Sequence, residues 1–279
     1  MTSRCALRTN SARRLAGGAA VAIGILAASI PVSTKRPHGS CFLLYEIGRG
    51  EVRREPSATC ATRVAPQSTF KVPHALAALD AGVVENVNAV IEYDGHQVDF
   101  PAWGRDHTLA SAMRYSVVWF FQEIAKRLGE RREREYLERF AYGNRDTSGG
   151  LTRFWLGTSL EISPEEQLAF LRKLYADELH VKRPAMAALR EILVQPPGTV
   201  MNAMGENPFA APWSADAVVS AKTGSGPAGG DTVRWVVGHV KRGSRSWIFV
   251  SNVVGDATLP ARAAIDQAER ALIAERVLR

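Results

Sequence analysis

A serine and a lysine stand three residues apart in the stretch PQSTFKVPHAL, which covers residues 66–76. Residues three apart lie on the same side of a helical turn, so the hydroxyl of Ser68 and the amine of Lys71 can meet. A neutral amine in that position can take the serine proton and make the oxygen a nucleophile. Pro73 is tolerated only near a helix start, which predicts that Ser68 lies at a helix entrance, where free backbone N–H groups stabilise negative charge.

The elements around this pair follow from the spacing of apolar residues. Residues 41–55 alternate apolar and polar side chains around a turn at 48–50, as a hairpin would. From about 71 to 195 the spacing is helical, and 109–129 and 164–179 are its clearest helices. Three β-rich runs and an amphipathic helix follow, at 217–222, 233–241, 247–254 and 259–278.

Strands and helices are therefore segregated rather than alternating. This predicts a mixed α+β fold, with an antiparallel sheet flanked by helices and a mostly helical subdomain at about 71–195 inserted between sheet strands. The first and last strands should share one sheet. The charged run at 131–140 alternates acids with bases and is interpreted as a solvated helix face.

The basic charge sits mostly at the start of the chain. The formal net charge is +7, but residues 1–36 hold six basic residues and no acid, which leaves about +1 for the rest. Arginines followed by a short apolar run at 15–29 predict a signal peptide over 1–36, cut between about 28 and 40, and a single domain at 37–279. The run is shorter than the ~20 residues of a membrane span. We expect a periplasmic protein without nucleic-acid or membrane partners.

Cysteine usage fits an exported protein. Cys5 lies in the predicted leader, which leaves Cys41 and Cys60 as an even pair in an oxidising compartment. They form either a disulfide or two buried thiols, and the sequence leaves both open.

Three other short motifs are common when taken singly. Lys222-Thr223-Gly224 ends an apolar run. The pattern indicates either the edge of a strand beside a cleft or a strand that leaves the core at a turn. Ser116 lies on a helical pattern and is by itself no more than a helix serine. Residues 142–144, Tyr-Gly-Asn, look like a turn.

Taken together and in order, these motifs resemble one family, the class D, oxacillinase-type, serine β-lactamases. The resemblance rests on STFK at 68–71, SVV at 116–118, YGN at 142–144, FW at 154–155 and KTG at 222–224, with WVVG at 235–238 and LPAR at 259–262. The second motif ends in Val118 rather than the asparagine of the related class A enzymes, and no E-x-x-L-N stretch supplies a class A glutamate. The implied fold is that of serine β-lactamases and penicillin-binding transpeptidases.

The resemblance implies roles for the catalytic residues. Ser68 would be acylated, and Lys71 would be carboxylated by CO₂ to N6-carboxylysine and serve as the base. Phe70, Val118 and Trp155 would form a low-dielectric wall that keeps the amine neutral, and Trp155 would donate its indole N–H to the carbamate. Apart from CO₂ or bicarbonate, no cofactor is implied.

The resemblance also implies how substrate binds and leaves. Ser116 would relay a proton to the departing nitrogen and Lys222 would hold the local charge. Backbone N–H groups of Ser68 and Ser225 would form the oxyanion hole, Gly224 would let the substrate backbone approach, and the substrate carboxylate would be bound by Thr223 and Arg262.

The expected partners are small β-lactams, and the chain is expected to be a monomer or homodimer. A metal site is not expected, because the six histidines show no H-x-H or H-x-x-x-H spacing. Two alternatives stay open: a penicillin-sensing domain that is acylated but does not turn over, and a D,D-peptidase.

Overall fold

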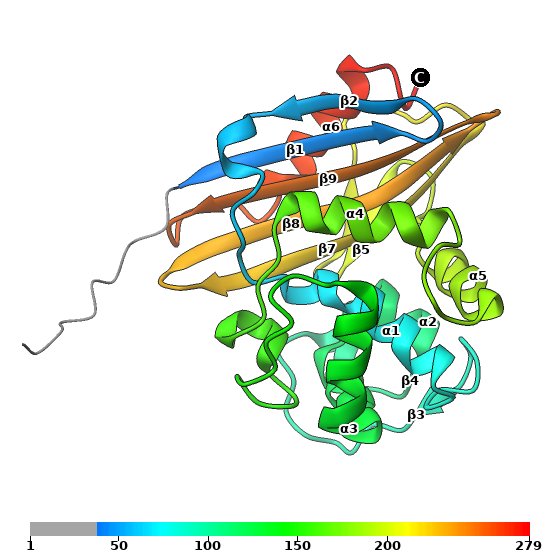
Figure 1. The fold of residues 1–279 in the computed structure, drawn as a ribbon, viewed down its shortest axis with the longest axis vertical. Coiled ribbons are helices and arrows are strands. Elements are labelled where there is room, and N and C mark those ends of the chain that lie inside the picture. Colours follow the sequence, from blue (N-terminus) through cyan, green and yellow to red (C-terminus); the bar gives the residue numbers. More distant parts are fainter. Residues whose placement is uncertain (1–37) are drawn as a thin grey trace, which may run out of the picture. The chain divides into compact units, whose positions relative to one another are not determined.

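The computed structural model describes residues 38–279, so the predicted signal peptide lies outside the described residues. A five-stranded sheet with the order β2-β1-β9-β8-β7 runs through this part of the chain, and every neighbouring pair is antiparallel (Figure 1). Its strands are β1 (Gly39–Glu46), β2 (Gly50–Glu55), β7 (Ala217–Ala228), β8 (Asp231–Arg242) and β9 (Arg245–Gly255). The first and last strands are hydrogen-bonded neighbours, as the sequence predicts.

The sheet is buried on both faces, because its side chains alternate between two apolar clusters. Phe42 and Leu44 of β1 pack with α6 (Ala263–Ala274), whereas Cys41 and Leu43 point to the helical layer on the other face. Helix α4 (Pro164–Tyr175) lies against β1 and β9 on that second face. A mixed α+β fold with an antiparallel sheet between helices is confirmed.

The remaining elements lie between β2 and β7. The helices are η1 (Ser57–Thr59), η2 (Gln67–Phe70), α1 (Lys71–Asp80), η3 (Pro101–Trp103), α2 (Leu109–Arg114), α3 (Val118–Phe140), η4 (Phe154–Thr158) and α5 (Arg183–Ile192). Two small antiparallel sheets, which the sequence patterns do not predict, pair β3 (Val90–Ile91) with β4 (His107–Thr108) and β5 (Thr199–Asn202) with β6 (Gly205–Pro208).

The helix predicted over 109–129 is wrong in one respect, because it is two helices. α2 ends at Arg114, and Ser116 adopts φ +57°, a left-handed conformation that no helix interior accepts. α3 then begins at Val118. The break turns the Ser116 side chain away from a helix face, which matters for the site described below.

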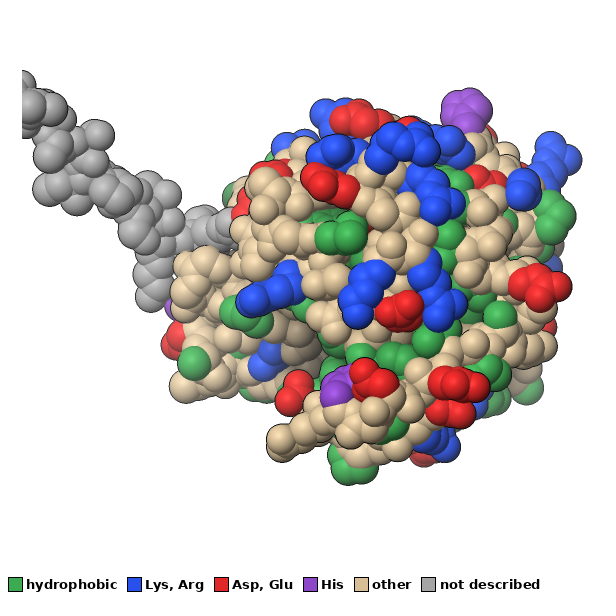
Figure 2. All heavy atoms as spheres, turned by 90° about the horizontal axis from the view of Figure 1, so that it is seen from below, with side chains coloured by type: hydrophobic (Ala, Val, Ile, Leu, Met, Phe, Trp, Pro, Cys, Tyr) green, Lys and Arg blue, Asp and Glu red, His purple; other side chains and the backbone are tan. Residues whose placement is uncertain are grey.

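The charged run at 131–140 lies on α3 and is only partly a solvated face. Ion pairs one turn apart join Arg131 to Glu135 and, at 2.5 Å, Arg134 to Glu130 just before the run. Figure 2 looks at the end of the molecule where α3 and β3 lie, and basic and acidic side chains sit beside one another there. Glu133, however, is buried, so one charge of the run belongs to the interior.

Cys41 of β1 and Cys60, just after η1, form a disulfide, and both side chains are fully buried. The bond ties the hairpin of β1 and β2 to the segment that leads into η2. None of the helices in 38–279 is long and apolar enough to cross a membrane.

We expect the double substitution Cys41→Ala, Cys60→Ala to lower the free energy of unfolding by about 3 kcal/mol, because the bond closes a loop spanning 19 positions in the unfolded chain. Urea unfolding of the variant, compared with the parent chain with and without a reductant, measures this. An unchanged midpoint would mean that the bond adds no stability.

Candidate active site

Ser68 and Lys71 lie where a short 3₁₀ turn, η2, passes into α1. Lys71 Nζ lies 2.8 Å from Ser68 Oγ, a hydrogen-bonding distance. The turn begins at Gln67, whose φ of +51° is rare for a residue with a side chain. Such strain is held only where the surroundings fix it, and here Gln67 Nε2 donates to the carbonyl of Pro227 at 2.7 Å.

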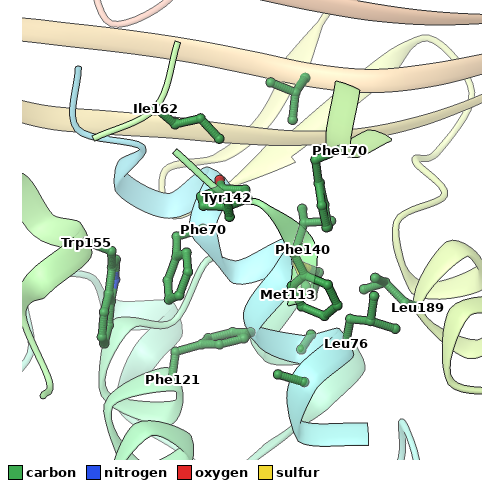
Figure 3. Packing of buried hydrophobic residues seen from close by; sticks show 14 of the residues in the cluster. Phe70, Leu76, Met113, Phe121, Phe140, Tyr142, Trp155, Ile162, Phe170 and Leu189 are labelled. Atoms are coloured by element: carbon green, nitrogen blue, oxygen red, sulfur yellow. The ribbon is translucent and has the colours of Figure 1, made fainter. Parts of the chain in front are cut away.

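The Lys71 amine has no exposed surface. Burial, with the nearby Lys222 charge second, holds the pKa of Lys71 well below its usual range. The ring centre of Phe121 lies 5.4 Å from Lys71 Nζ. Phe70 stacks on Trp155 with 5.5 Å between ring centres, and Figure 3 shows these three rings gathered beside α1. The amine therefore sits in a dry, aromatic niche.

A second buried amine comes from the sheet. Lys222 Nζ donates to Ser116 Oγ at 2.9 Å and to the carbonyl of Thr223 at 3.0 Å. Burial alone lowers the pKa of Lys222 to about 7. Because Ser116 stands at the break between α2 and α3, its hydroxyl reaches a strand 106 positions further along the chain. The site thus holds two serine–lysine pairs.

The edge of the sheet reaches the nucleophile because Gly224 has no side chain. A Cβ at Gly224 would lie 2.8 Å from the carbonyl oxygen of Pro66 and 3.1 Å from the backbone nitrogen of Thr69. The backbone of β7 therefore lies directly against η2, the turn that carries Ser68. Ser116, Ser68 and Gly224 line one pocket, together with Thr223, Ser225 and Val118.

The segment that carries Trp155 is held by the Tyr-Gly-Asn turn. Asn144 Nδ2 donates to the carbonyl of Ser159 at 2.8 Å, and Asn144 Oδ1 accepts from the backbone of Glu161 at 3.0 Å. Gly143 has φ +56°, and a Cβ there would lie 2.0 Å from the Glu161 carbonyl. The motif is therefore structural, and it closes the loop around η4.

Trp155 has a buried hydrogen-bond donor that no acceptor among residues 38–279 satisfies. Its side chain is fully buried, and within residues 38–279 nothing accepts a hydrogen bond from Nε1. An unpartnered indole N–H at this depth is costly, so it points to an acceptor that completes the site.

Arg262, expected to bind a carboxylate, is placed differently from the other predicted residues. Its Nε donates to Asp266 at 3.1 Å, and its Nη2 donates to the carbonyl of Pro208 at 3.1 Å. Ala261, next to it, lines the pocket, whereas Arg262 does not.

Two features beside Lys71 were missed in the sequence. Phe121, which faces the amine, is one of several core aromatics on a helix and carries no special signal. His74 Nε2 lies 2.7 Å from Glu133 Oε1, with both side chains buried, and the ring of His74 packs on Phe70 and Trp155. His74 stands one turn after Lys71, which could have drawn notice, but its partner comes from a run that looks solvated.

Comparison with known proteins agrees with this geometry. Residues 49–279 match the family model described as the penicillin binding protein transpeptidase domain, which defines the general class. The chain is 35% identical to the probable β-lactamase YbxI of Bacillus subtilis, over 81% of this chain and 78% of that one. It is 38% identical to β-lactamase OXA-48 of Klebsiella pneumoniae, over 67% of this chain and 65% of that one.

Comparison with solved structures narrows this class. The class D β-lactamase BAT-2 delta mutant is 32% identical, with a TM-score of 0.75, covering 87% of this chain and 93% of that one. The chain belongs to the class D β-lactamase family. Within the described residues, no group of three or more His, Cys, Asp or Glu side chains is placed to hold a metal ion.

The buried lysine of β7 should cost stability in a pH-dependent way. Its pKa is about 7 when folded and near 10.5 when unfolded, so the unfolded chain binds more protons between these values and the cost shrinks as pH rises. With Lys71 unmodified, in CO₂-free buffer, we expect Lys222→Met to be more stable than the parent. The difference in the free energy of unfolding between the two proteins should narrow by about 1.4 kcal/mol per pH unit between pH 7 and 10.

Urea unfolding of both proteins across that range measures the gap. If the free energies of unfolding of the two proteins change in parallel with pH, Lys222 titrates normally. If Lys222→Met is less stable than the parent at every pH, burial of the amine carries no penalty.

Proposed function

We propose that the chain hydrolyses β-lactam antibiotics through an acyl-enzyme on Ser68, with carboxylated Lys71 as the general base for acylation and deacylation, and so confers resistance. The observation that carries the proposal is the meeting of two hydrogen-bonded serine–lysine pairs in one pocket, Ser68 with Lys71 and Ser116 with Lys222. Membership of the class D β-lactamase family supports it.

Ser68 is suited to attack the cyclic amide. It sits in η2 at the N-terminal end of α1, where backbone N–H groups and the helix dipole favour the negative charge that develops on the carbonyl oxygen. The close approach at Gly224 brings the backbone of Ser225 to the same pocket as Ser68. The two backbone N–H groups would form the oxyanion hole, in which one donor is typically worth about 2.7 to 4 kcal/mol.

The niche around Lys71 fits a carbamate. A carbamate on Lys71 would supply a base beside Ser68. The lowered pKa of Lys71 leaves a neutral amine, the form that combines with CO₂, and the rings of Phe70 and Phe121 keep water away. Trp155 Nε1, a buried donor without a partner among residues 38–279, would bind a carbamate oxygen.

Ser116 and Lys222 are suited to protonate the leaving group, the nitrogen of the β-lactam ring. Ser116 Oγ accepts from Lys222 at 2.9 Å, so the hydroxyl hydrogen is free to pass to the departing ring nitrogen. Lys222, whose pKa is about 7, can replace that proton near neutral pH. Thr223 lines the pocket beside them and would bind the substrate carboxylate, with Arg262 as the cation that the sequence predicts.

Export to the periplasm is part of the proposal. The disulfide between Cys41 and Cys60 supports an oxidising compartment, and the leader-like pattern at 1–36 supports export.

Substitution of the nucleophile separates this enzyme from other penicillin-recognising domains. We expect Ser68→Ala to lose covalent labelling by benzylpenicillin in the mass spectrum and to lower kcat for nitrocefin by at least about 1,000-fold. Ser148→Ala, an exposed serine, is the control and should label as the parent does.

The parent chain should turn over nitrocefin many times per active site. A single burst followed by a stable adduct would instead identify a penicillin sensor, and labelling of the Ser68→Ala protein would place the nucleophile elsewhere.

The carbamate predicts that the loss of activity at acid pH depends on the bicarbonate concentration. Because burial lowers the pKa of Lys71, the neutral amine that combines with CO₂ is favoured, and protonation of the nitrogen as the pH falls would expel CO₂. We expect activity to fall reversibly at mildly acid pH and to recover with bicarbonate. Trp155→Phe, which keeps a ring but removes the N–H, should need at least about tenfold more bicarbonate.

The measurements are nitrocefin rates against bicarbonate concentration and the ¹³C resonance of protein equilibrated with ¹³CO₂. Trp247→Phe, in the apolar cluster on the other face of the sheet, is the matched control and should keep the parent dependence. Rates that ignore bicarbonate in the parent chain would refute the carbamate.

A further inference from the structure

Gln67, the residue before the nucleophile, joins three parts of the pocket wall. It begins η2, its side chain is buried, and it lines the pocket together with Ser68. Its amide crosses to β7, where Nε2 donates to the carbonyl of Pro227 at 2.7 Å, 160 positions further along the chain. Gly157 of η4 lies against the same contact. The amide of Gln67 therefore stands where η2, β7 and η4 meet.

Two glycines leave the space that this amide occupies. A Cβ at Gly226 would lie 2.5 Å from Gln67 Oε1 and 2.9 Å from Nε2. A Cβ at Gly157 would lie 3.2 Å from Gln67 Nε2 and 2.5 Å from the carbonyl oxygen of Pro227. A side chain at either glycine would displace the amide or its acceptor, so the amide is enclosed both from β7 and from η4.

The backbone of Gln67 is fixed as well. Its φ of +51° is kept only where the surroundings hold it. The segment before it is tied to the sheet, because the carbonyl of Ala65 accepts from Trp235 Nε1 of β8 at 3.0 Å. The N–H of Ser68 belongs to the planar peptide group that Gln67 begins, so the backbone angles of Gln67 set the direction of that N–H.

The side chain of Gln67 holds the strand that carries a second backbone donor. β7 is the last strand of the sheet and pairs with β8 along one edge. Alternate residues of such a strand direct both backbone groups to the same edge. Pro227 directs its carbonyl to the edge that faces η2, so Ser225, two residues earlier, directs its N–H to that edge as well.

We propose that Gln67 is a positioning residue, which fixes the separation of the backbone N–H groups of Ser68 and Ser225 that would bind the oxyanion. Its backbone directs the first N–H, and its side chain holds the strand that carries the second. The inference rests on the proposed function. A tetrahedral oxyanion forms in acylation and again in deacylation, so the contact between Gln67 and Pro227 would serve both steps.

The first test replaces the amide with a side chain of similar volume that has no donor. We expect Gln67→Met to lower kcat for nitrocefin by about 10- to 100-fold and to change KM by less than about threefold, because displaced oxyanion donors affect the transition state more than substrate binding. Phenylboronic acid, which forms a tetrahedral adduct with an active-site serine, should bind more weakly by a similar factor. Steady-state rates and inhibition constants measure both effects.

The second test displaces the amide from the other side. Gly226→Ala leaves Gln67 in place, but the new Cβ would lie 2.5 Å from Gln67 Oε1. We expect kcat to fall in the same range, again with little change in KM. Circular dichroism and urea unfolding establish that each variant is folded, and Gly226→Ala carries the test if Gln67→Met does not fold.

Gln195 provides the matched control. Its Nε2 donates to the carbonyl of Ala221 at 3.0 Å, on the same edge of β7, and Gln195 is not among the described residues that line the pocket. Gln195→Met should lower the free energy of unfolding, because it removes a comparable amide contact. It should keep kcat, KM and the affinity for phenylboronic acid within about threefold of the parent values.

The outcomes are distinct. If Gln67→Met and Gly226→Ala both keep the parent kcat, the amide only stabilises the edge of the sheet and the proposal is wrong. It is also wrong if the loss appears in KM while phenylboronic acid binds as tightly as before, because Gln67 would then only shape the pocket wall. Either result leaves the lactamase function intact, whereas a parent chain that does not turn over nitrocefin would refute the proposed function itself.

Discussion

The site depends on the removal of one lysine amine from water. A charged ammonium in an apolar niche costs several kcal/mol even after relaxation, so burial lowers the pKa of Lys71 and favours its neutral form. Neutrality is what makes the group useful, because an ammonium can neither accept a proton nor combine with CO₂. The second buried amine, Lys222, adds to the effect, since two like charges so close would repel.

The rest of the fold can be understood as the enclosure of that amine. Its walls come from segments far apart in the chain: Phe70 precedes α1, Phe121 lies on α3 and Trp155 lies in η4. Two glycines position the segments that carry Trp155 and Phe70. The turn at Gly143 fastens the loop of η4, and the absence of a side chain at Gly224 lets the sheet edge close against η2. The apolar enclosure is stabilising, and that stability offsets the cost of two buried amines and of the positive φ at Gln67 and Ser116.

What the sequence predicts well is local. The distance between Ser68 and Lys71 follows from helical geometry over three residues, and the antiparallel sheet follows from alternation within each strand. Ser116 shows the limit: its neighbours have helical spacing, and only the contact with Lys222, 106 positions away, accompanies the break there. The same holds for Glu133, whose charged neighbours look solvated although it pairs with buried His74, and for Arg234, whose place beside Ser225 depends on strand register.

The distribution of charge separates the interior behind Lys71 from the pocket in front of it. Behind the amine, the buried carboxyl group of Glu133 lies 2.7 Å from the ring of His74. In front, the partners of Lys222 and Arg234 within residues 38–279 are neutral oxygens. Lys222 donates to Ser116 and Thr223, and Arg234 donates to Ser225, Leu259 and Pro260. Within residues 38–279, the basic groups beside the pocket are thus bonded to hydroxyls and carbonyls rather than to carboxylates. An anionic ligand would recover there part of the interaction energy that those basic groups lost on leaving water. The anionic substrates that we propose for this chain would therefore meet donors that no carboxylate of residues 38–279 already occupies.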